Sequence, residues 1–459
     1  MINVINKSCF PKALKKARVT PLYKGGKKDS ANDYRPISVL PVTSKVFEKV
    51  LNTRLVQYMN SLNFLYPYQY GFREAGDTTS ATIDLVSDLQ VRVDRGNRAA
   101  LVSLDLRKAF DTVNHGILLR KMELLGIRGV CHGLFKSYLE GRNQCVSLNN
   151  IKSSCLDLTC GVPQGSILGP TLFLLYINSV ANLELRGKIR LYADDTIIAY
   201  FGDSVDDLNV DMKSDLVKIE RWLINHKLSL NIEKSGYMFV SSQRVLDQPS
   251  LDFGNNQLKY CHNIKYLGLL IDETLTWDEH INKLKNKLYA PVGILKRLSY
   301  SIPSHLLRSV YFSLIHSHLQ YLAVLWYLTS KYLINPIKTL QNRAIKNIYG
   351  LPLRYPTELL YRKYNIMSLE QIYKYQICTF VHHNLHGTRH TNISMRLRNT
   401  VHNHGTRHQN DIDLLRASTK YGKNSVFYRG ASVYNSVPLN LRCLNFSQFR
   451  LKIKKHFLA

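Results

Sequence analysis

The sequence predicts an α+β protein in which strands and helices are mixed in the first half and helices dominate the second. Apolar runs that lead into acidic residues, such as residues 99–106, are typical of buried strands. Beyond about residue 278 the apolar residues recur at helical spacing.

Lys and Arg number 62 against 33 Asp and Glu, a formal net charge of +29. This excess favours a polyanionic partner, although an inert basic surface would give the same count.

Each element is predicted from the local pattern of apolar, polar and turn-forming residues. Thr43 or Ser44 is expected to cap the first long helix, and Ser204 with Asp207 resembles a capping box. The predicted elements are, in chain order, a helix from 43 or 44, a strand at 99–106, a helix at 118–125, a helix at 168–180, a hairpin at 188–201 that turns at Asp194-Asp195, a helix from 204, strands at 228–240 and 264–272, and helices beyond 278.

We expect two main units followed by two smaller segments. These are an α+β unit at 1–275, a helical unit at 276–386, a polar His-rich linker at 387–424 and a small C-terminal module at 425–459. The histidines of the linker have irregular spacings and no cysteine beside them, so a zinc site there is the less favoured interpretation.

The cysteines and the apolar stretches indicate a reduced, intracellular protein outside the membrane. None of the eight cysteines forms a C-x-x-C pair, and the N-terminus has no apolar signal region. Residues 309–330 contain no formally charged side chain, but their His, Gln, Ser and Tyr favour a buried helix over a bilayer span.

Three acidic residues are the candidates for chemistry. Asp105 lies at the end of a predicted strand, and Asp194 and Asp195 directly follow apolar and aromatic residues. An ionised carboxylate beside apolar residues costs free energy unless a positive group binds to it. Two divalent cations about 3.5–4 Å apart would satisfy them, and carboxylate oxygens favour Mg²⁺ or Mn²⁺ over zinc. Taken alone, an acid pair in a turn is more often a solvated hairpin tip.

The order of these segments and their flanks resemble the successive motifs of reverse transcriptases, specifically those of non-LTR retrotransposons of the jockey and CR1 type. The resemblance runs from about Ala17 to Asp272, and it is specific because many motifs occur in the right order. It implies a right-hand polymerase, with fingers and palm built on an antiparallel sheet over 1–275, followed by a helical thumb and C-terminal region. The motifs are Tyr34-Arg35-Pro36-Ile37-Ser38, Gln69-Tyr70-Gly71-Phe72-Arg73, Asp105 with Ala109-Phe110-Asp111, Gly161-Val162-Pro163-Gln164-Gly165-Ser166, Tyr192-Ala193-Asp194-Asp195 and Tyr266-Leu267-Gly268.

The resemblance and the chemistry together imply the catalytic group. Asp105, Asp194 and Asp195 are expected to bind two Mg²⁺ ions, with Mn²⁺ as a substitute. Lys234 matches the lysine proposed to protonate the leaving pyrophosphate, and an ordinary surface lysine is the alternative. Asp111 is expected to hold local structure rather than a metal ion.

A second set of residues is implied to bind the incoming nucleotide. Arg35 is expected to contact the triphosphate, since a guanidinium suits phosphate oxygens. The basic loop at 24–28 could assist, but the sequence does not single out one lysine. Phe110 is expected to exclude a 2′-hydroxyl, with an ordinary core phenylalanine as the alternative. Gln164 is expected to touch the nascent base pair or sugar, and Gly165 to let the backbone approach the substrate.

The remaining implied contacts concern primer and template. Tyr192 is expected beside the primer end, and Tyr266 and Gly268 resemble the primer-grip strand pair. Residues 281–299 carry five Lys or Arg and no acid, which suits a thumb that grips the phosphates of a duplex.

The resemblance implies an RNA template, a DNA primer and deoxynucleoside triphosphates as partners, and no membrane.

Residues 371–459 contain only two acids, too few for a ribonuclease H site. The stretch before Ala17 is too short for the endonuclease of such elements, so we expect that activity in a domain or protein absent from this chain. Such elements generally prime on nicked chromosomal DNA, which implies a nuclear location.

Two other functions fit part of the pattern. A catalytically inactive or co-opted retrotransposon remnant would bind nucleic acid without polymerising, but the presence of the three acids, Gln164 and Arg35 argues against it. Phe110 argues against an RNA-dependent RNA polymerase, and so does the Tyr-x-Asp-Asp form of the segment at residues 192–195.

Overall fold

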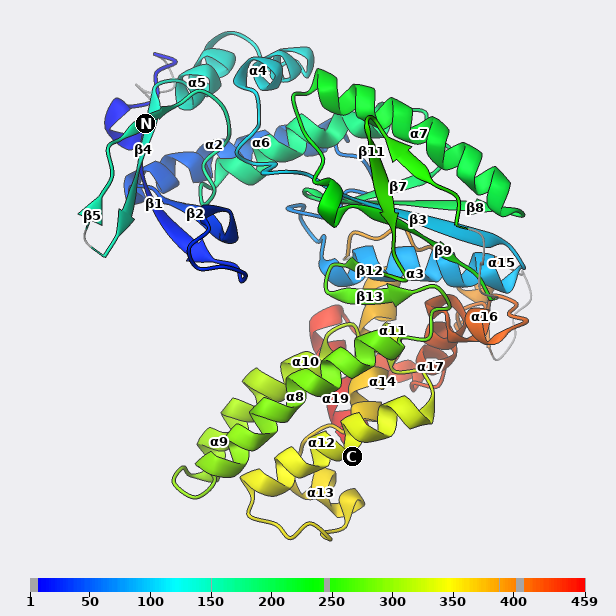
Figure 1. The fold of residues 1–459 in the computed structure, drawn as a ribbon. Coiled ribbons are helices and arrows are strands. Elements are labelled where there is room, and N and C mark those ends of the chain that lie inside the picture. The colour runs from blue at the N-terminus through cyan, green and yellow to red at the C-terminus, as the bar shows by residue number, and fades with distance from the viewer. Residues whose placement is uncertain (1–6, 150, 243–247, 388, 402–407, 459) are drawn as a thin grey trace.

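The chain has a mixed α+β architecture, as predicted: three β-sheets are followed by a helical C-terminal part (Figure 1). The computed structural model describes residues 7–149, 151–242, 248–387, 389–401 and 408–458.

The strands and helices have the following bounds. The strands are β1 Lys16–Tyr23, β2 Tyr34–Val39, β3 Arg98–Asp105, β4 Arg142–Leu148, β5 Ile151–Lys152, β6 Leu156–Leu158, β7 Lys188–Tyr192, β8 Asp195–Gly202, β9 Gly236–Val240, β10 Leu251–Phe253, β11 Asn256–Tyr260, β12 Asn263–Tyr266 and β13 Leu269–Asp272. The α-helices are α2 Val42–Ser61, α3 Thr78–Asp94, α4 His115–Leu124, α5 Gly129–Leu139, α6 Leu168–Ile177, α7 Val205–Asn225, α8 Asp278–Leu298, α9 Ser304–Tyr311, α10 Ser317–Gln320, α11 Ala323–Trp326, α12 Lys331–Ile348, α13 Thr357–Tyr364, α14 Leu369–Leu385, α15 Arg398–Val401, α16 Lys420–Asn424, α17 Ala431–Asn435, α18 Leu439–Arg442 and α19 Phe446–Leu458. Short 3-10 and π segments are η1 Lys12–Leu14, η2 Ala31–Asp33, η3 Asn178–Asn182, η4 Ile232–Lys234, η5 Phe312–His316 and η6 Val426–Gly430.

The six-stranded sheet, in the order β10-β11-β9-β3-β8-β7, has helices on both faces (Figure 1). Alternate residues of a strand point to opposite faces. Leu101 and Ile197 therefore pack with α3, whereas Val102 and Ile198 pack with α6 and α7. Strands β9, β3, β8 and β7 are antiparallel, as expected, but β11 joins β9 in parallel, because β10 carries the chain back before it returns.

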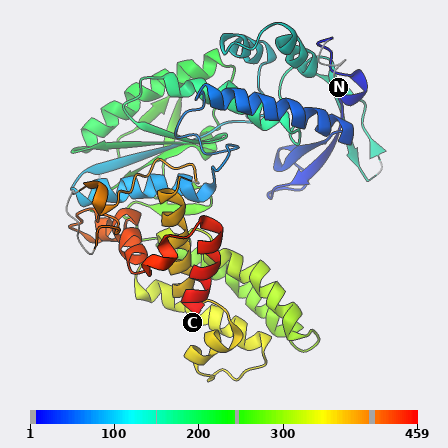
Figure 2. The ribbon, with the colours of Figure 1, turned by 180° about the vertical axis from the view of Figure 1, so that it is seen from behind.

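A smaller five-stranded sheet lies at the other end of α2 and α6. Its order is β2-β1-β4-β5, with β6 also paired to β4. Seen from behind, α2 extends from this small sheet toward the larger one (Figure 2). The small sheet carries Arg35 on β2.

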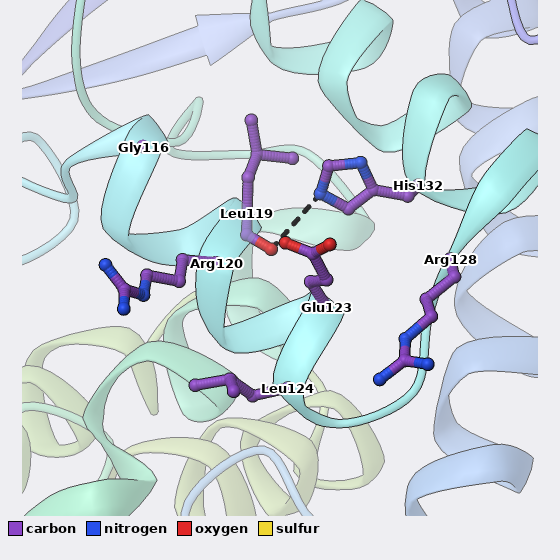
Figure 3. Close-up of a pocket in the computed structure, with 7 residues that line it drawn as sticks. All are labelled: Gly116, Leu119, Arg120, Glu123, Leu124, Arg128 and His132. Carbon is purple, nitrogen blue, oxygen red and sulfur yellow. Dashed lines mark hydrogen bonds between the residues drawn. The ribbon is translucent and has the colours of Figure 1, made fainter.

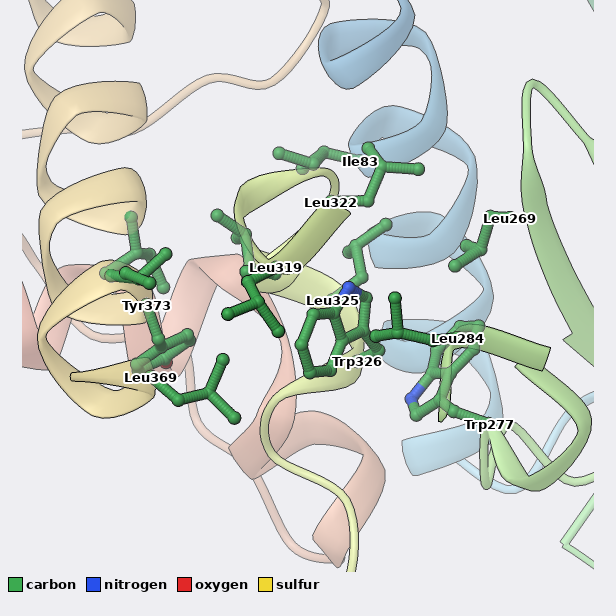
Figure 4. Close-up of a cluster of buried hydrophobic side chains, with 14 of the residues drawn as sticks. Ile83, Leu269, Trp277, Leu284, Leu319, Leu322, Leu325, Trp326, Leu369 and Tyr373 are labelled. Atoms are coloured by element: carbon green, nitrogen blue, oxygen red, sulfur yellow. The ribbon is translucent and has the colours of Figure 1, made fainter. Parts of the chain in front are cut away.

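The helical C-terminal part shares one hydrophobic cluster with the larger sheet. Trp326 lies at its centre and is fully buried beside Trp277 and Leu284 (Figure 4). Ile83 from α3 and Tyr373 from α14 belong to the same cluster. The two halves of the chain are therefore packed around a common core.

Several predicted elements are confirmed. The strand at 99–106 is β3, and the helix after the hairpin is α7, whose first turn is capped by Ser204 accepting a hydrogen bond from the Asp207 amide. The helical pattern beyond 278 is also confirmed, since α8 begins at Asp278 and continues through Pro291 without a break.

The prediction for the first long helix was partly wrong. Helix α2 begins at Val42, and no side chain caps it. The helical spacing of the apolar residues predicts that Val46 lies on the buried face, but Val46 is 55% exposed and Glu48 is fully buried. The reason is a tertiary contact: the Glu48 carboxylate accepts a hydrogen bond from the Ile167 amide at 2.7 Å and so caps the entry to α6.

The strand predicted at 228–240 is shorter than expected. Helix α7 continues to Asn225, η4 follows, and β9 begins only at Gly236.

Candidate active site

The hairpin of β7 and β8 carries the adjacent acids. Tyr192 pairs with Asp195, so the turn consists of Ala193 and Asp194, and Asp195 is the first residue of β8. The turn therefore lies one residue earlier than predicted. Ala193 has a left-handed φ of 57°, a conformation that costs a non-glycine residue about 1 kcal/mol or more.

The sheet register brings the third acid to the same place. Asp105, the last residue of β3, is directly opposite Asp195 in the antiparallel β3–β8 pair. Directly opposed residues have Cβ atoms about 4.5–5.5 Å apart. The Asp105 carboxylate accepts a hydrogen bond from Asn231 Nδ2 at 3.1 Å, and its amide donates to Ser235 Oγ at 3.0 Å. The register therefore brings the three acids to the end of β3 and β8 at which the β7–β8 hairpin turns.

The three carboxylates repel one another. Burial and the charges of Asp194 and Asp105 raise the pKa of Asp195 to about 6. The pKa of Asp194 is also raised, mainly by burial and further by Asp105, while the positive charge of Arg35 opposes the rise. Uncompensated negative charge on hard oxygen donors suits a divalent cation.

The acids are not yet gathered around a metal position. Across the described residues, no group of three or more His, Cys, Asp or Glu side chains is arranged to hold a metal ion. One oxygen of the Asp105 carboxylate, Oδ2, accepts the hydrogen bond from Asn231.

The raised pKa of Asp195 predicts a pH-dependent stability. The pKa of Asp195 is about 6 in the folded protein and near the ordinary value of 3.8 in the unfolded chain. Between pH 3.8 and pH 6 the folded state therefore binds more protons at this carboxyl than the unfolded state does. Without divalent cations, the free energy of unfolding should therefore fall as the pH rises through this window. Asp195→Asn should remove that fall. It should stabilise the protein at pH 7 by less than about 1 kcal/mol, because Asp195, although protein atoms surround its carboxylate, keeps more than a third of its surface open to solvent, which screens the repulsion. Urea unfolding with EDTA at pH 4 and pH 7 measures both, and an unchanged pH dependence in the variant would contradict the assignment.

The glycine-rich turn at 161–166 is held against the segment that follows β3. Gln164 Nε2 donates to the Asp111 carboxylate at 2.9 Å, and His115 Nε2 donates to the Gly161 carbonyl at 2.8 Å. Gly165 has a φ of 115°, and a Cβ there would lie 2.7 Å from the Ser38 carbonyl oxygen. Only glycine fits this contact between the turn and β2.

Phe110 lies between two other rings at the same site. It stacks on Phe173, with ring centroids 4.6 Å apart, and meets Phe72 edge-on at 6.1 Å. Its ring is half-buried. This packing fixes the position of the ring.

The cationic residues come from the small sheet. Arg35 is exposed on β2, and its charge acts on Asp194. Lys24, at the start of the β1–β2 connection, lowers the pKa of Asp111, against the larger effect of burial. This effect distinguishes Lys24 from Lys27 and Lys28. The sequence alone did not single out one of these lysines.

The residues expected near the primer lie in different environments. Tyr192 is half-buried, and burial raises its pKa, with Asp77, Tyr321 and Asp195 adding to the rise. Gly268 lies in the β12–β13 turn with a φ of 87°. Tyr266 is 3% exposed, so its ring belongs to the core. Lys234 is exposed at the end of η4.

A buried ion-pair network that the sequence analysis missed lies beneath the hairpin. Arg190 on β7 is fully buried and contacts Asp84 and Asp88 of α3, with N–O distances of 2.6 Å to each. Lys188 adds a contact to Asp88 at 3.2 Å. Burial alone would raise the pKa of Asp88, but Arg190 and Lys188 hold it below its ordinary value. The signal in the sequence was a pair of acids one helical turn apart, Asp84 and Asp88, next to apolar residues such as Leu85 and Leu89.

The comparison with known families agrees with this geometry. A family model described as "Reverse transcriptase (RNA-dependent DNA polymerase)" matches residues 26–271, more than half of the chain. The chain belongs to the reverse transcriptase family. The motif-based resemblance is thereby confirmed at the level of the family.

Several curated reverse transcriptase relatives are mobile-element proteins of Drosophila melanogaster. The probable RNA-directed DNA polymerase from transposon X-element and the RNA-directed DNA polymerase from mobile element jockey are each 28% identical, over 76% of this chain and 39% of their own length. The probable polymerase from transposon BS is 28% identical over 79% of this chain and 41% of its own length. The chain thus spans about two fifths of these relatives. The resemblance to the jockey group is confirmed.

Among solved structures, the matches include telomerases of Candida. Telomerase from Candida tropicalis in complex with a fragment of telomeric RNA aligns with a TM-score of 0.44 and 11% identity, over 82% of this chain and 64% of that chain. The apo form of the same telomerase aligns with a TM-score of 0.42 and 12% identity, over 84% of this chain and 70% of that one.

Two further features complete the picture of this reverse transcriptase. A hollow between α4 and α5 is lined by Arg120, Glu123, Arg128 and His132, whose ring lies against the Leu119 carbonyl (Figure 3). None of the predicted site residues lines it.

Within the described ranges, no helix has the length and apolar character needed to cross a membrane.

Proposed function

We propose that this chain is an RNA-directed DNA polymerase that transfers nucleotides from deoxynucleoside triphosphates to the 3′-hydroxyl of a DNA primer on an RNA template. The observation that carries the proposal is the convergence of Asp105, Asp194 and Asp195 at one edge of the six-stranded sheet. Family membership supports the same chemistry. The division into fingers and palm at 1–275, thumb at 276–386, linker at 387–424 and C-terminal module at 425–459 is part of the proposal.

The three carboxylates would hold two Mg²⁺ ions, for which Mn²⁺ could substitute. When bound, such cations supply Lewis-acid activation of the hydroxyl and neutralise phosphate charge. Asn231 would hold the Asp105 carboxylate until the site is filled. Lys234 would donate a proton to the leaving pyrophosphate, provided that nucleic acid or nucleotide fixes its exposed side chain nearby.

The incoming nucleotide would lie between the two sheets. Arg35 and Lys24 would bind the triphosphate, since both charges act on acids of the site. Gln164 and Gly165 would contact the nucleotide, positioned by Asp111 and β2. Phe110 would block a ribose 2′-hydroxyl with a ring that its neighbours hold in place.

The primer and duplex would lie toward the helical part. Tyr192 and Gly268 would face the primer end, while the buried Tyr266 would support them from the core. The basic residues of α8 would bind duplex phosphates, including Lys283, Lys287 and Arg297. Strand-nicking would come from a domain or protein outside this chain, and priming on chromosomal DNA would place the reaction in the nucleus.

Primer extension tests the proposal directly. The purified chain, given Mg²⁺, deoxynucleotides and a DNA primer annealed to RNA, is expected to extend the primer to the end of the template. Binding without extension would instead support a retrotransposon remnant. Extension that prefers ribonucleotides would support an RNA polymerase.

Sugar selection should depend on Phe110. Phe110→Val opens space beside the sugar while leaving the carboxylates untouched, so discrimination against ribonucleotides should fall about 10- to 100-fold. The measurement is the ratio of kcat/KM for a deoxynucleotide to that for the matching ribonucleotide. Phe253→Val is the control, because Phe253 is a core phenylalanine on β10, at the far edge of the sheet. An unchanged ratio in Phe110→Val would assign the ring to packing alone.

A further inference from the structure

The C-terminal segment 389–392 contacts a loop near the N-terminus of the chain. The His390 amide donates to the Ala75 carbonyl at 3.0 Å, and His390 Nε2 donates to the Pro67 carbonyl at 2.7 Å. Asn392 Nδ2 lies 2.9 Å from the same carbonyl oxygen and 3.0 Å from Tyr70 Oη. The three side-chain contacts join residues more than 320 positions apart.

An ion pair strengthens this contact at its other end. Arg389 lies 2.7 Å from the Asp77 carboxylate, which also caps α3 by accepting a hydrogen bond from the Ser80 amide. The guanidinium of Arg389 covers the ring of Phe380 on α14. The segment is thus attached to the loop on one side and to the helical part on the other.

The same loop holds the turn that carries the acids. Gln69 is 1% exposed, and its Oε1 accepts hydrogen bonds from the amides of Ala193 at 3.1 Å and Gly71 at 2.9 Å. The Tyr70 amide donates to the Leu191 carbonyl at 2.9 Å. A Cβ on Gly71 would lie 2.4 Å from the Ala193 nitrogen, so the two backbones are in direct contact.

This contact falls on the most strained residue of the turn. Ala193 has a left-handed φ and directly precedes Asp194. A residue in this conformation persists only when its surroundings hold it there. The hydrogen bond from its amide to Gln69 is such a restraint.

We propose that residues 389–392 form a positioning clamp, which fixes the loop 67–76 and, through Gln69, the turn that carries Asp194 and Asp195. The inference rests on the proposed polymerase function for the role of the acids, but the clamp itself is a structural claim. Arg389, His390 and Asn392 are positioning residues, since they reach the acids only through the loop.

Asn392→Asp tests the clamp with little change in volume, because the carboxylate cannot donate to the Pro67 carbonyl and repels its oxygen. Asn399→Asp is the matched control, because Asn399 has an exposed side chain on α15, outside the segment 389–392. In the full-length chain, loss of the hydrogen bond to Pro67 and the new repulsion there should accelerate amide hydrogen exchange about tenfold in peptides covering 66–76 and 188–196. Exchange in α8 and α12 should stay unchanged, which separates loosening of the clamp from general unfolding.

Primer extension gives the second readout. Asn392→Asp should lower kcat while leaving KM for the deoxynucleotide nearly unchanged, because the acids rather than the nucleotide contacts are displaced. Faster exchange in a chain that never extends primers would support the clamp and count against the polymerase. Normal exchange and normal kcat in Asn392→Asp, equal to those of Asn399→Asp, would overturn the clamp and leave the polymerase standing. Arg389→Gln should act in the same direction, which provides a second variant if the first does not fold.

Discussion

Asp194→Asn is expected to lower the rate of nucleotide incorporation by about a thousandfold or more, since a metal ligand supplies several kcal/mol of transition-state stabilisation. Asparagine keeps the shape of the side chain but removes the charge that would hold a cation. The protein should fold normally, because the native carboxylate is destabilised by burial and by Asp105. Nucleic-acid binding, measured by filter retention, should change little.

Asp252→Asn is the control for this prediction. Asp252 is exposed on β10 in the same sheet, on the opposite side from the hairpin. Incorporation by this variant should equal that of the native chain. If Asp194→Asn retained more than a tenth of the native rate, the three acids would not be the catalytic group.

Arg190→Leu is expected to destabilise the protein by about 3–5 kcal/mol, because it leaves the buried acids of α3 without their partner. The measurement is the free energy of unfolding from urea titration. Arg186→Leu is the matched control, since Arg186 is 59% exposed in its pair with Asp211 and should contribute less than about 1 kcal/mol.

A double variant separates the loss of the pair from the cost of an isolated charge. Arg190→Leu combined with Asp84→Leu removes both partners of the most buried contact. It should be less destabilised than Arg190→Leu alone, since a buried charge without its partner costs more than the absent pair. Equal losses in the single and double variants would show that Asp84 does not depend on Arg190.

The positions of the three acids could be predicted from the sequence because their signals are local. Asp105 ends an apolar run that is typical of a buried strand, and Asp194 and Asp195 interrupt the apolar pattern of a hairpin, which predicts a turn there. Antiparallel pairing of β3 with β8 then sets Asp105 opposite Asp195. The motif order supplied the family, and with it the expectation that these strands are neighbours.

The supporting residues could not be predicted, because each depends on a partner distant in sequence. Asn231 contacts Asp105 across 126 residues, Gln69 contacts Ala193 across 124, and Arg190 contacts Asp84 across 106. Their residue types are ordinary for a loop or a surface. Burial gives them their roles, and burial is a property of the folded chain. For the same reason the burial of Glu48 on α2 could not be predicted.

The cluster around Trp326 bears on how such a chain can be recombined. Ile83 of α3 and Tyr373 of α14 lie on opposite sides of the boundary expected near residue 276, yet they line the same interior. A chimera joined at that boundary would pack the tryptophans of one parent against α3 of the other parent. A stable chimera should therefore take α3 and the helical part from the same parent. Swaps confined to the small sheet that carries Arg35 would leave this interior untouched.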